Sequence, residues 1–134
     1  MIDHVSVAVR DLATAESFYS ALLSPLGMRK LREWPNAAVG FGKKYPEFWI
    51  NRRAAMTRVA DDSGLHICLR ATDVRAVEDF HAAALKAGGT SDGAPGLRTE
   101  YHASYYAAFV RDPDGNRIEA VTFLRDIDNS PSQG

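Results

Sequence analysis

Residues 3–12 read DHVSVAVRDL, and the chain returns to the same pattern at residues 65–74, which read LHICLRATDV. Both stretches carry histidine at the second position, apolar side chains at alternating positions, and aspartate where a strand gives way to a helix. The repeat continues at the same offset of 62 positions in four pairs: Glu16 and Glu78, Phe18 and Phe80, Leu23 and Leu85, Gly27 and Gly89. Self-similarity at a fixed offset indicates two copies of one structural unit.

The first copy has the pattern of a βαβββ module. In residues 2–10, valines alternate with other side chains, which is typical of a strand with one buried face. Asp11 is a suitable N-cap for a helix whose apolar residues recur at helical spacing, and Pro25 and Gly27 end that helix. Three shorter strands are expected, separated by turn sequences, at residues 28–33, 38–42 and 48–51.

The second copy repeats the strand and the helix and then departs from the pattern. Its helix is capped by Asp73, and two glycines end it. Residues 90–96 are rich in glycine, proline and serine, and we expect a mobile loop there. Residues 112–115 (DPDG) are the strongest hairpin signal in the chain, and they separate strands expected at 101–111 and 117–124.

The sequence therefore predicts an α+β fold in which two tandem βαβββ modules form a curved mixed sheet around a cleft, with the helices on the opposite face. At 134 residues, one domain is expected. Its parts are the first module at 1–51, a polar linker at 52–64, the second module at 65–124 and a polar tail at 125–134.

Composition excludes several classes of protein. A net charge of −1 gives no general attraction to nucleic acid or to anionic membranes. The longest apolar runs are too short to span a bilayer, and the sole cysteine, Cys68, permits no intramolecular disulfide. We therefore expect a cytoplasmic protein whose partner is a small molecule.

Strand alternation places three metal-binding side chains on one side of the sheet. If the valines of the first strand pack against the helix, His4 faces the cleft. The same alternation in the second copy turns His66 towards the cleft. Ile118 and Ala120 fit the helix-packing row of the last strand, which leaves Glu119 opposite. A single strand histidine is more often a packing residue, but its repetition on the same face favours a ligand role. Two imidazoles and one carboxylate form a facial set suited to Fe²⁺, Mn²⁺, Ni²⁺ or Zn²⁺.

The two openings, together with FVRDPDGNRIEAV at residues 109–121, resemble the vicinal oxygen chelate superfamily. That group includes glyoxalase I, extradiol ring-cleaving dioxygenases, fosfomycin-modifying thiol transferases and bleomycin resistance proteins. The resemblance extends from residue 1 to about residue 124. It implies paired βαβββ modules and one divalent metal ion, with the family's ligands matching His4, His66 and Glu119. Metal sites in this superfamily can be shared across a dimer, so a homodimer is expected.

One departure from the resemblance concerns glyoxalase I. Those enzymes use a fourth ligand, a carboxylate on the last strand of the first module, which aligns near Ile50 or Asn51. Asn51 is a weak ligand, and Glu47 lies at the entrance of that strand. A site with three protein ligands is closer to the pattern of the ring-cleaving dioxygenases and the fosfomycin-modifying enzymes.

The strand before the hairpin supplies candidates for proton transfer. Regular pairing would set Val110 opposite Glu119 and would bring Tyr106 and His102 to the same face. The imidazole of His102 is a residue type suited to proton transfer, and the Tyr106 hydroxyl can orient a bound oxygen, so the expected catalytic set is Glu119, His102 and Tyr106. A one-residue bulge would reverse the direction of His102. Tyr105 is assigned to aromatic packing.

Other side chains leave alternatives open. Cys68 is either a soft ligand or reactive thiol, or small apolar filling. Trp34 and Trp49 line either an aromatic-binding wall or a subunit contact. Three arginines are candidates for binding an anionic substrate, although strand-end arginines are usually solvated: Arg70, Arg98 and Arg117.

The preferred interpretation is a metal-dependent enzyme of the glyoxalase or dioxygenase type, a lyase or a dioxygenase. Its small substrate chelates the metal through adjacent oxygens. The alternative is a non-catalytic protein of the bleomycin-resistance type, which sequesters a ligand in the cleft without turnover.

Overall fold

The computed structural model describes residues 1–124, and the polar tail predicted at 125–134 lies outside these residues. The order βαβββ occurs twice. The first module contains β1 (Val5–Val9), α1 (Leu12–Leu23), the short 3₁₀ helix η1 (Ser24–Leu26), β2 (Arg29–Trp34), β3 (Ala38–Gly42) and β4 (Phe48–Arg52). The second contains β5 (His66–Arg70), α2 (Val74–Lys86), β6 (Thr90–Leu97), β7 (Tyr105–Arg111) and β8 (Arg117–Phe123).

The two helices begin at the aspartates of the repeat. The Asp11 side chain accepts a hydrogen bond from the backbone N–H of Thr14 at 2.9 Å, and Asp73 accepts one from Ala76 at 2.8 Å. Each carboxylate satisfies an N–H that has no partner within the helix. Within residues 1–124, neither helix is long and apolar enough to cross a membrane.

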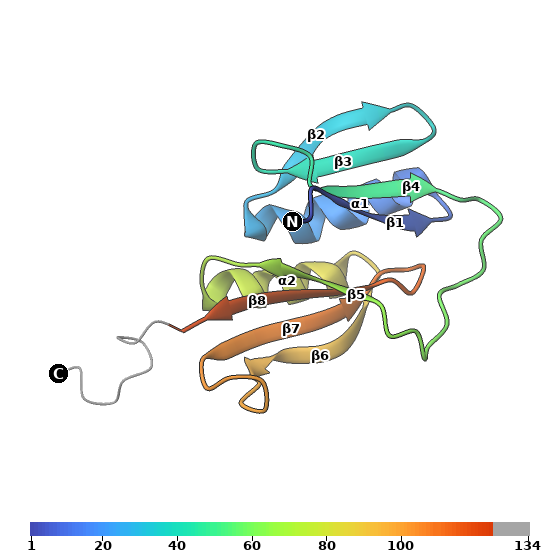
Figure 1. Ribbon diagram of the computed structural model, residues 1–134. Coiled ribbons are helices and arrows are strands. Elements are labelled where there is room, and N and C mark those ends of the chain that lie inside the picture. Colours follow the sequence, from blue (N-terminus) through green and yellow to red (C-terminus); the bar gives the residue numbers. More distant parts are fainter. Residues whose placement is uncertain (125–134) are drawn as a thin grey trace.

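The strands form two four-stranded sheets, in the orders β1-β4-β3-β2 and β5-β8-β7-β6. Both sheets are mixed, because β1 pairs with β4, and β5 with β8, in parallel, whereas the other pairs are antiparallel. Figure 1 shows the two modules with β1 and β5 at their neighbouring edges. The predicted α+β fold of two βαβββ modules is confirmed, with separate sheets in place of one continuous sheet.

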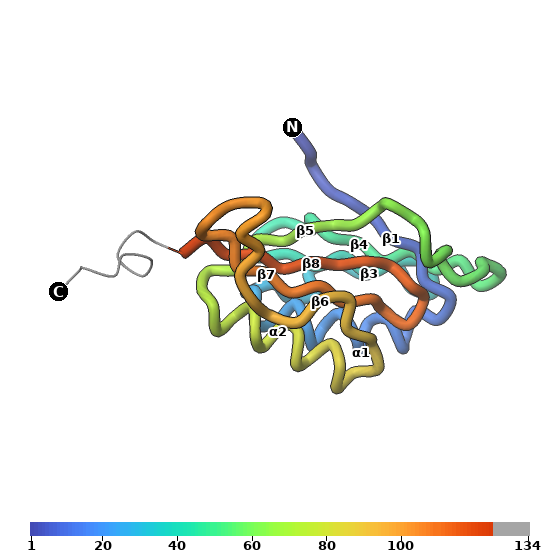
Figure 2. The backbone as a smooth tube through the Cα atoms, turned by 90° about the horizontal axis from the view of Figure 1, so that it is seen from below, coloured from blue at the N-terminus to red at the C-terminus, as the bar shows by residue number. Residues whose placement is uncertain are grey.

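Both helices cover the same side of the sheets (Figure 2). There α1 packs against α2, and one hydrophobic core runs through both modules. The predicted inward rows of β1 and β8 belong to this core: Val7, Val9, Ile118 and Ala120. Within residues 1–124, the opposite side of each sheet carries no helix, and we call it the open face.

The segment expected to be a mobile loop is an edge strand, so that prediction was wrong. β6 pairs with β7, but its register shifts twice, between Ser91 and Gly93 and between Gly93 and Gly96. An edge strand tolerates Pro95, since one side of its backbone needs no partner. Gly93 has no side chain for a further reason: a Cβ there would lie 2.9 Å from the ring of Phe109.

The turn between β7 and β8 joins the second module to the first. Asp112 is 2% exposed, and its Oδ2 accepts hydrogen bonds from the Tyr19 hydroxyl at 2.6 Å and from Asn116 Nδ2 at 2.8 Å. The same Asn116 amide donates to the Ala8 carbonyl at 2.8 Å. Burial raises the pKa of Asp112, while the bonds from Tyr19 and Asn116 favour its ionised form. The turn is therefore a buried polar connection between the modules.

We expect the substitution Tyr19→Phe to lower the free energy of unfolding by about 1.5–3 kcal/mol, because it leaves a buried carboxylate without one of its donors. Urea unfolding at neutral pH, followed by circular dichroism, measures this change. Tyr45→Phe is the matched control, since the Tyr45 hydroxyl bonds to the exposed Asp3, and it should leave the free energy of unfolding nearly unchanged. Equal effects of the two substitutions would contradict a stabilising role for the buried hydrogen bond between Tyr19 and Asp112.

Candidate functional site

The open face of the second module brings together two of the three predicted metal ligands. His66 Nε2 of β5 lies 3.1 Å from Glu119 Oε1 of β8. Cys68 is the residue directly opposite Glu119 in the parallel pair. Glu119 is only 2% exposed although it points away from the hydrophobic core, so its neighbours on the open face shield it from water.

Tyr105 of β7 holds the second oxygen of this carboxylate. Its hydroxyl donates to Glu119 Oε2 at 2.5 Å, and Cys68 Sγ lies 3.9 Å from the same hydroxyl oxygen. Burial and the bond to Glu119 raise the pKa of Tyr105, so its O–H remains a donor near neutral pH. Burial and the charge of Glu119 raise the pKa of the Cys68 thiol to about 12, so this side chain is neutral.

The register of the hairpin differs by one residue from the expected one. Phe109, and not Val110, lies opposite Glu119, because the pairing resumes at Arg111 and Arg117 on either side of the turn. Alternate residues of β7 therefore change faces, and the Tyr106 hydroxyl donates to Glu78 of α2 at 3.0 Å. Tyr106, which the sequence placed in the catalytic set, lies on the helix side of the sheet.

Sequence reasoning assigned Tyr105 to packing and so missed its contact with Glu119. The strict two-residue alternation of the strand was the signal that could have found it. Tyr105 and Phe109 lie on the open face together. Only the number of residues in the turn had to be known to place them on the same face as Glu119.

His102 lies between β6 and β7, at the aromatic border of the site. Its Nδ1 accepts a hydrogen bond from the backbone N–H of Ser104 at 2.9 Å. Its ring meets Phe123 edge-on with centroids 6.0 Å apart, and Phe123 in turn contacts Tyr105. In the described part of the chain no hydrogen bond links His102 to Glu119.

The third predicted ligand, His4, lies on the open face of the first module. Its Nδ1 is 2.7 Å from Asp3 Oδ1, and the Tyr45 hydroxyl donates to the same oxygen at 2.9 Å. These two bonds lower the pKa of Asp3, His4 contributing most. An ionised carboxylate can only accept, so Nδ1 carries the proton and the Nε2 lone pair is available.

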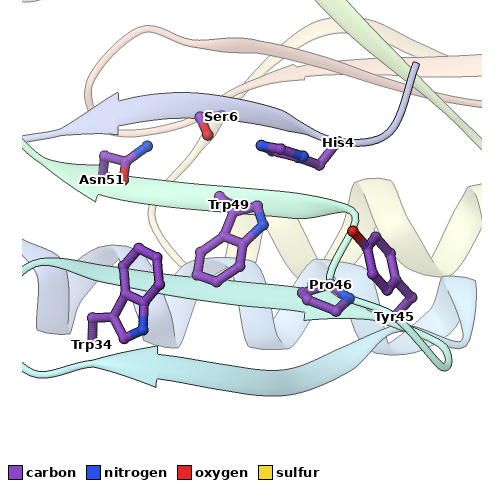
Figure 3. Close-up of a pocket in the computed structure, with 7 residues that line it drawn as sticks. All are labelled: His4, Ser6, Trp34, Tyr45, Pro46, Trp49 and Asn51. Atoms are coloured by element: carbon purple, nitrogen blue, oxygen red, sulfur yellow. The ribbon is translucent and has the colours of Figure 1, made fainter. Parts of the chain in front are cut away.

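His4 borders a pocket of about 230 Å³ on this face (Figure 3). The side chains that line it come from β1 and the residue before it, from β2, from β4 and from the loop before β4: His4, Ser6, Trp34, Tyr45, Pro46, Trp49 and Asn51.

Strand register identifies the counterpart of Glu119 in the first module. Ser6 pairs with Trp49 in the parallel pair β1–β4, just as Cys68 pairs with Glu119 in β5–β8. The fourth-ligand position expected near Ile50 or Asn51 is thus occupied by Trp49, whose indole N–H can only donate. The first module offers His4 and no matching carboxylate.

The donors have the chemistry of a divalent-metal site, but one chain does not bring all three together. Within residues 1–124, no three His, Cys, Asp or Glu side chains lie close enough to hold a metal ion. His66 and Glu119 form one part on the second module, and His4, with its Nε2 free, forms the other on the first.

Comparison with known proteins supports a common fold. The family profile described as the Glyoxalase/Bleomycin resistance protein/Dioxygenase superfamily matches residues 1–120. A crystal structure of a glyoxalase/bleomycin resistance protein from Albidiferax ferrireducens T118 is 30% identical, with a TM-score of 0.76, over 90% of this chain and 96% of that chain. A comparison with curated protein sequences finds no match.

Two more distant structures share the fold alone. A mutant of the fosfomycin resistance protein FosX from Listeria monocytogenes, in complex with Mn(II) and 1S,2S-dihydroxypropylphosphonic acid, is 12% identical with a TM-score of 0.69, over 94% of this chain and 92% of that chain. A lactoylglutathione lyase from Agrobacterium tumefaciens is 18% identical with a TM-score of 0.61, over 90% of this chain and 92% of that chain.

We expect Tyr105→Phe to lower the free energy of unfolding by about 1–2 kcal/mol, because the shielded Glu119 carboxylate loses a donor. Tyr106→Phe, one residue along the same strand, should change it by less than about 0.5 kcal/mol, since Glu78 is exposed. Urea unfolding of both variants measures the difference. A larger loss of stability in Tyr106→Phe than in Tyr105→Phe would show that Tyr106, and not Tyr105, lies on the open face.

Proposed function

Because this chain belongs to the glyoxalase/bleomycin resistance protein/dioxygenase superfamily, we propose that it is a metal-dependent enzyme acting on a small substrate that offers two adjacent oxygens. The observation that carries the proposal is the His66–Glu119 pair, with Nε2 and Oε1 3.1 Å apart on the open face. His66, Glu119 and His4 are the proposed ligands of one divalent ion, either Fe²⁺, Mn²⁺, Ni²⁺ or Zn²⁺. The Mn(II) in the FosX complex supports a divalent ion in this fold.

We propose further that a homodimer completes the metal site. A two-fold arrangement in which the open face of the first module covers that of the partner's second module would bring the partner subunit's His4 to His66 and Glu119. Two-fold symmetry would produce two such sites. Exposed aromatic side chains of the second module support this arrangement, among them Tyr101 and Phe123, which are 61% and 39% exposed.

The chain's own residues have distinct parts in this proposal. A bound divalent ion supplies Lewis-acid stabilisation of negative charge that develops on the substrate oxygens. The Tyr105 hydroxyl holds Glu119 Oε2, which leaves Oε1 directed at the ligand position beside His66. The Asp3 carboxylate fixes the tautomer and the ring orientation of His4.

His102 is the proposed proton-transfer residue. Its Nδ1 is engaged by Ser104, and its Nε2 makes no hydrogen bond within residues 1–124. Because Nδ1 accepts from Ser104, the proton of the neutral ring is on Nε2, which can donate to a substrate oxygen. The ring takes up a further proton only when Nδ1 releases the Ser104 N–H. Tyr106 has no part in the proposal, because its hydroxyl is bonded to Glu78.

A reaction panel separates the enzyme from the ligand-sequestering alternative. We expect the metal-loaded protein to turn over a substrate in one of three assays: a diketone–thiol adduct, a catechol or a thiol addition. Saturable ligand binding without product in all three, by protein that holds no metal, would instead identify a sequestering protein of the bleomycin-resistance type.

Metal content tests the proposed ligands directly. Protein purified without chelator should retain a divalent ion, measured by elemental analysis. His66→Ala and Glu119→Ala should each weaken metal binding by about 100-fold or more, since even residues that only orient ligands are worth about 10–100-fold. His102→Gln is the matched control, because it removes an imidazole that is not a proposed ligand, and it should retain the metal. Unchanged metal content in Glu119→Ala would refute the ligand set.

Mixing two inactive variants tests the shared site. His4→Ala and Glu119→Ala, each by itself, should bind metal too weakly to retain it through purification. Unfolded, mixed in equal amounts and refolded together, they should recover about one quarter of the wild-type sites. Half of the random dimers pair unlike chains, and each of these has one intact site out of two. No recovery, with dimers re-formed, would mean that each site is built within one chain.

A further inference from the structure

Two tryptophans form an aromatic surface on the open face of the first module. Trp34 of β2 and Trp49 of β4 have ring centroids 5.3 Å apart and planes inclined by 33°. Trp34 is 63% exposed. Large aromatic surfaces that remain open to water mark places where something else binds.

Gly40 lets the indole of Trp49 lie against the sheet. The two residues are directly opposite in the antiparallel pair β3–β4. A Cβ at Gly40 would lie 2.9 Å from three atoms of the indole ring, so any other residue would lift the ring from the strand. The glycine therefore allows the indole ring of Trp49 to lie flat against the sheet, and we call this ring the platform.

Polar side chains stand along one edge of this platform. His4 lies just before β1, Ser6 lies in β1 and Asn51 in β4, and all three line the same pocket (Figure 3). Within residues 1–124, neither the Ser6 hydroxyl nor the Asn51 amide makes a side-chain hydrogen bond. Among the described residues, no lysine or arginine lines the pocket, so it has no counter-ion for a phosphonate or carboxylate group.

The volume limits what fits. The pocket has about 230 Å³, which exceeds the roughly 150 Å³ of an engineered protein cavity that holds benzene. It is smaller than the roughly 300 Å³ at which pockets for drug-sized ligands begin. One ring with small substituents therefore fits the pocket.

We propose that this pocket binds a small, uncharged planar aromatic ring, stacked on Trp49, bordered by Trp34, and with its polar substituents directed to His4, Ser6 and Asn51. The inference rests on the proposed function in one respect, since His4 is also a proposed metal ligand, and it then gives the substrate class of that site. The platform itself is complete within one chain, so ring binding is measurable without metal.

The experiment uses the fact that Trp34 and Trp49 are the only two tryptophans of the chain. Full-length protein labelled with 5-fluorotryptophan has two ¹⁹F signals, which single Trp→Phe variants assign. The probes are catechol and trans-1,2-cyclohexanediol, in the presence of EDTA. Both carry two adjacent hydroxyls on a six-membered ring, but only catechol is planar and aromatic. We expect catechol to shift both signals with saturation, and the diol to shift neither.

Two variants test the platform. Trp34→Leu should weaken catechol binding about tenfold, because a stacking contact is lost, whereas Trp34→Phe keeps an aromatic ring and should weaken it less. Gly40→Ala should weaken binding by lifting Trp49. Trp34→Leu changes an exposed side chain, so this variant is expected to fold. It therefore tests the platform even if Gly40→Ala does not fold.

Three results would overturn the inference: no saturable shift with catechol, equal shifts with the saturated diol, or shifts that depend on protein concentration alone. The last result would assign the tryptophans to a subunit contact. The metal proposal fails separately, through unchanged metal content in Glu119→Ala, while the ¹⁹F shifts persist.

Discussion

The buried carboxylate of Asp112 is the constraint on which the arrangement of the two modules depends. Its Oδ2 is bonded by Tyr19 of the first module and its Oδ1 by two backbone N–H groups of its own turn. The linker joins the same turn, since the Val59 N–H donates to the Asp114 carbonyl at 3.0 Å. A buried carboxylate must be fully hydrogen-bonded, so the turn has one conformation and β8 one register. The position of Glu119 follows from that register.

The two modules share a backbone plan and have diverged in chemistry. On the first, the open face carries His4, Ser6 and Trp49, and on the second the same strand positions carry His66, Cys68 and Glu119. One face therefore offers an imidazole beside an aromatic platform, and the other an imidazole beside a carboxylate. The proposed dimer combines the two, so that each half of the duplication supplies what its copy lacks.

Much of the fold follows from local patterns. The duplicated aspartates cap both helices, and alternation correctly assigned the faces of β1, β5 and β8, because side chains of a strand must alternate between core and water. β6 was missed, since its glycines and proline carry no strand signal, and its pairing with β7 forms it. Tyr105 and Tyr106 were exchanged because a one-residue change in the turn reverses every side chain of a strand.

By itself, the sequence determined that the chain is a duplication, that His4, His66 and Glu119 leave the core, and that the last hairpin turns at residues 112–115. These features depend on local spacing and residue type. Only the tertiary structure decided that Glu119 meets His66 and Tyr105 while His4 stands on the other sheet beside two tryptophans. The physical reason is that the register of the hairpin and the separation of the sheets depend on contacts between residues far apart in the chain, such as that of Tyr19 with Asp112.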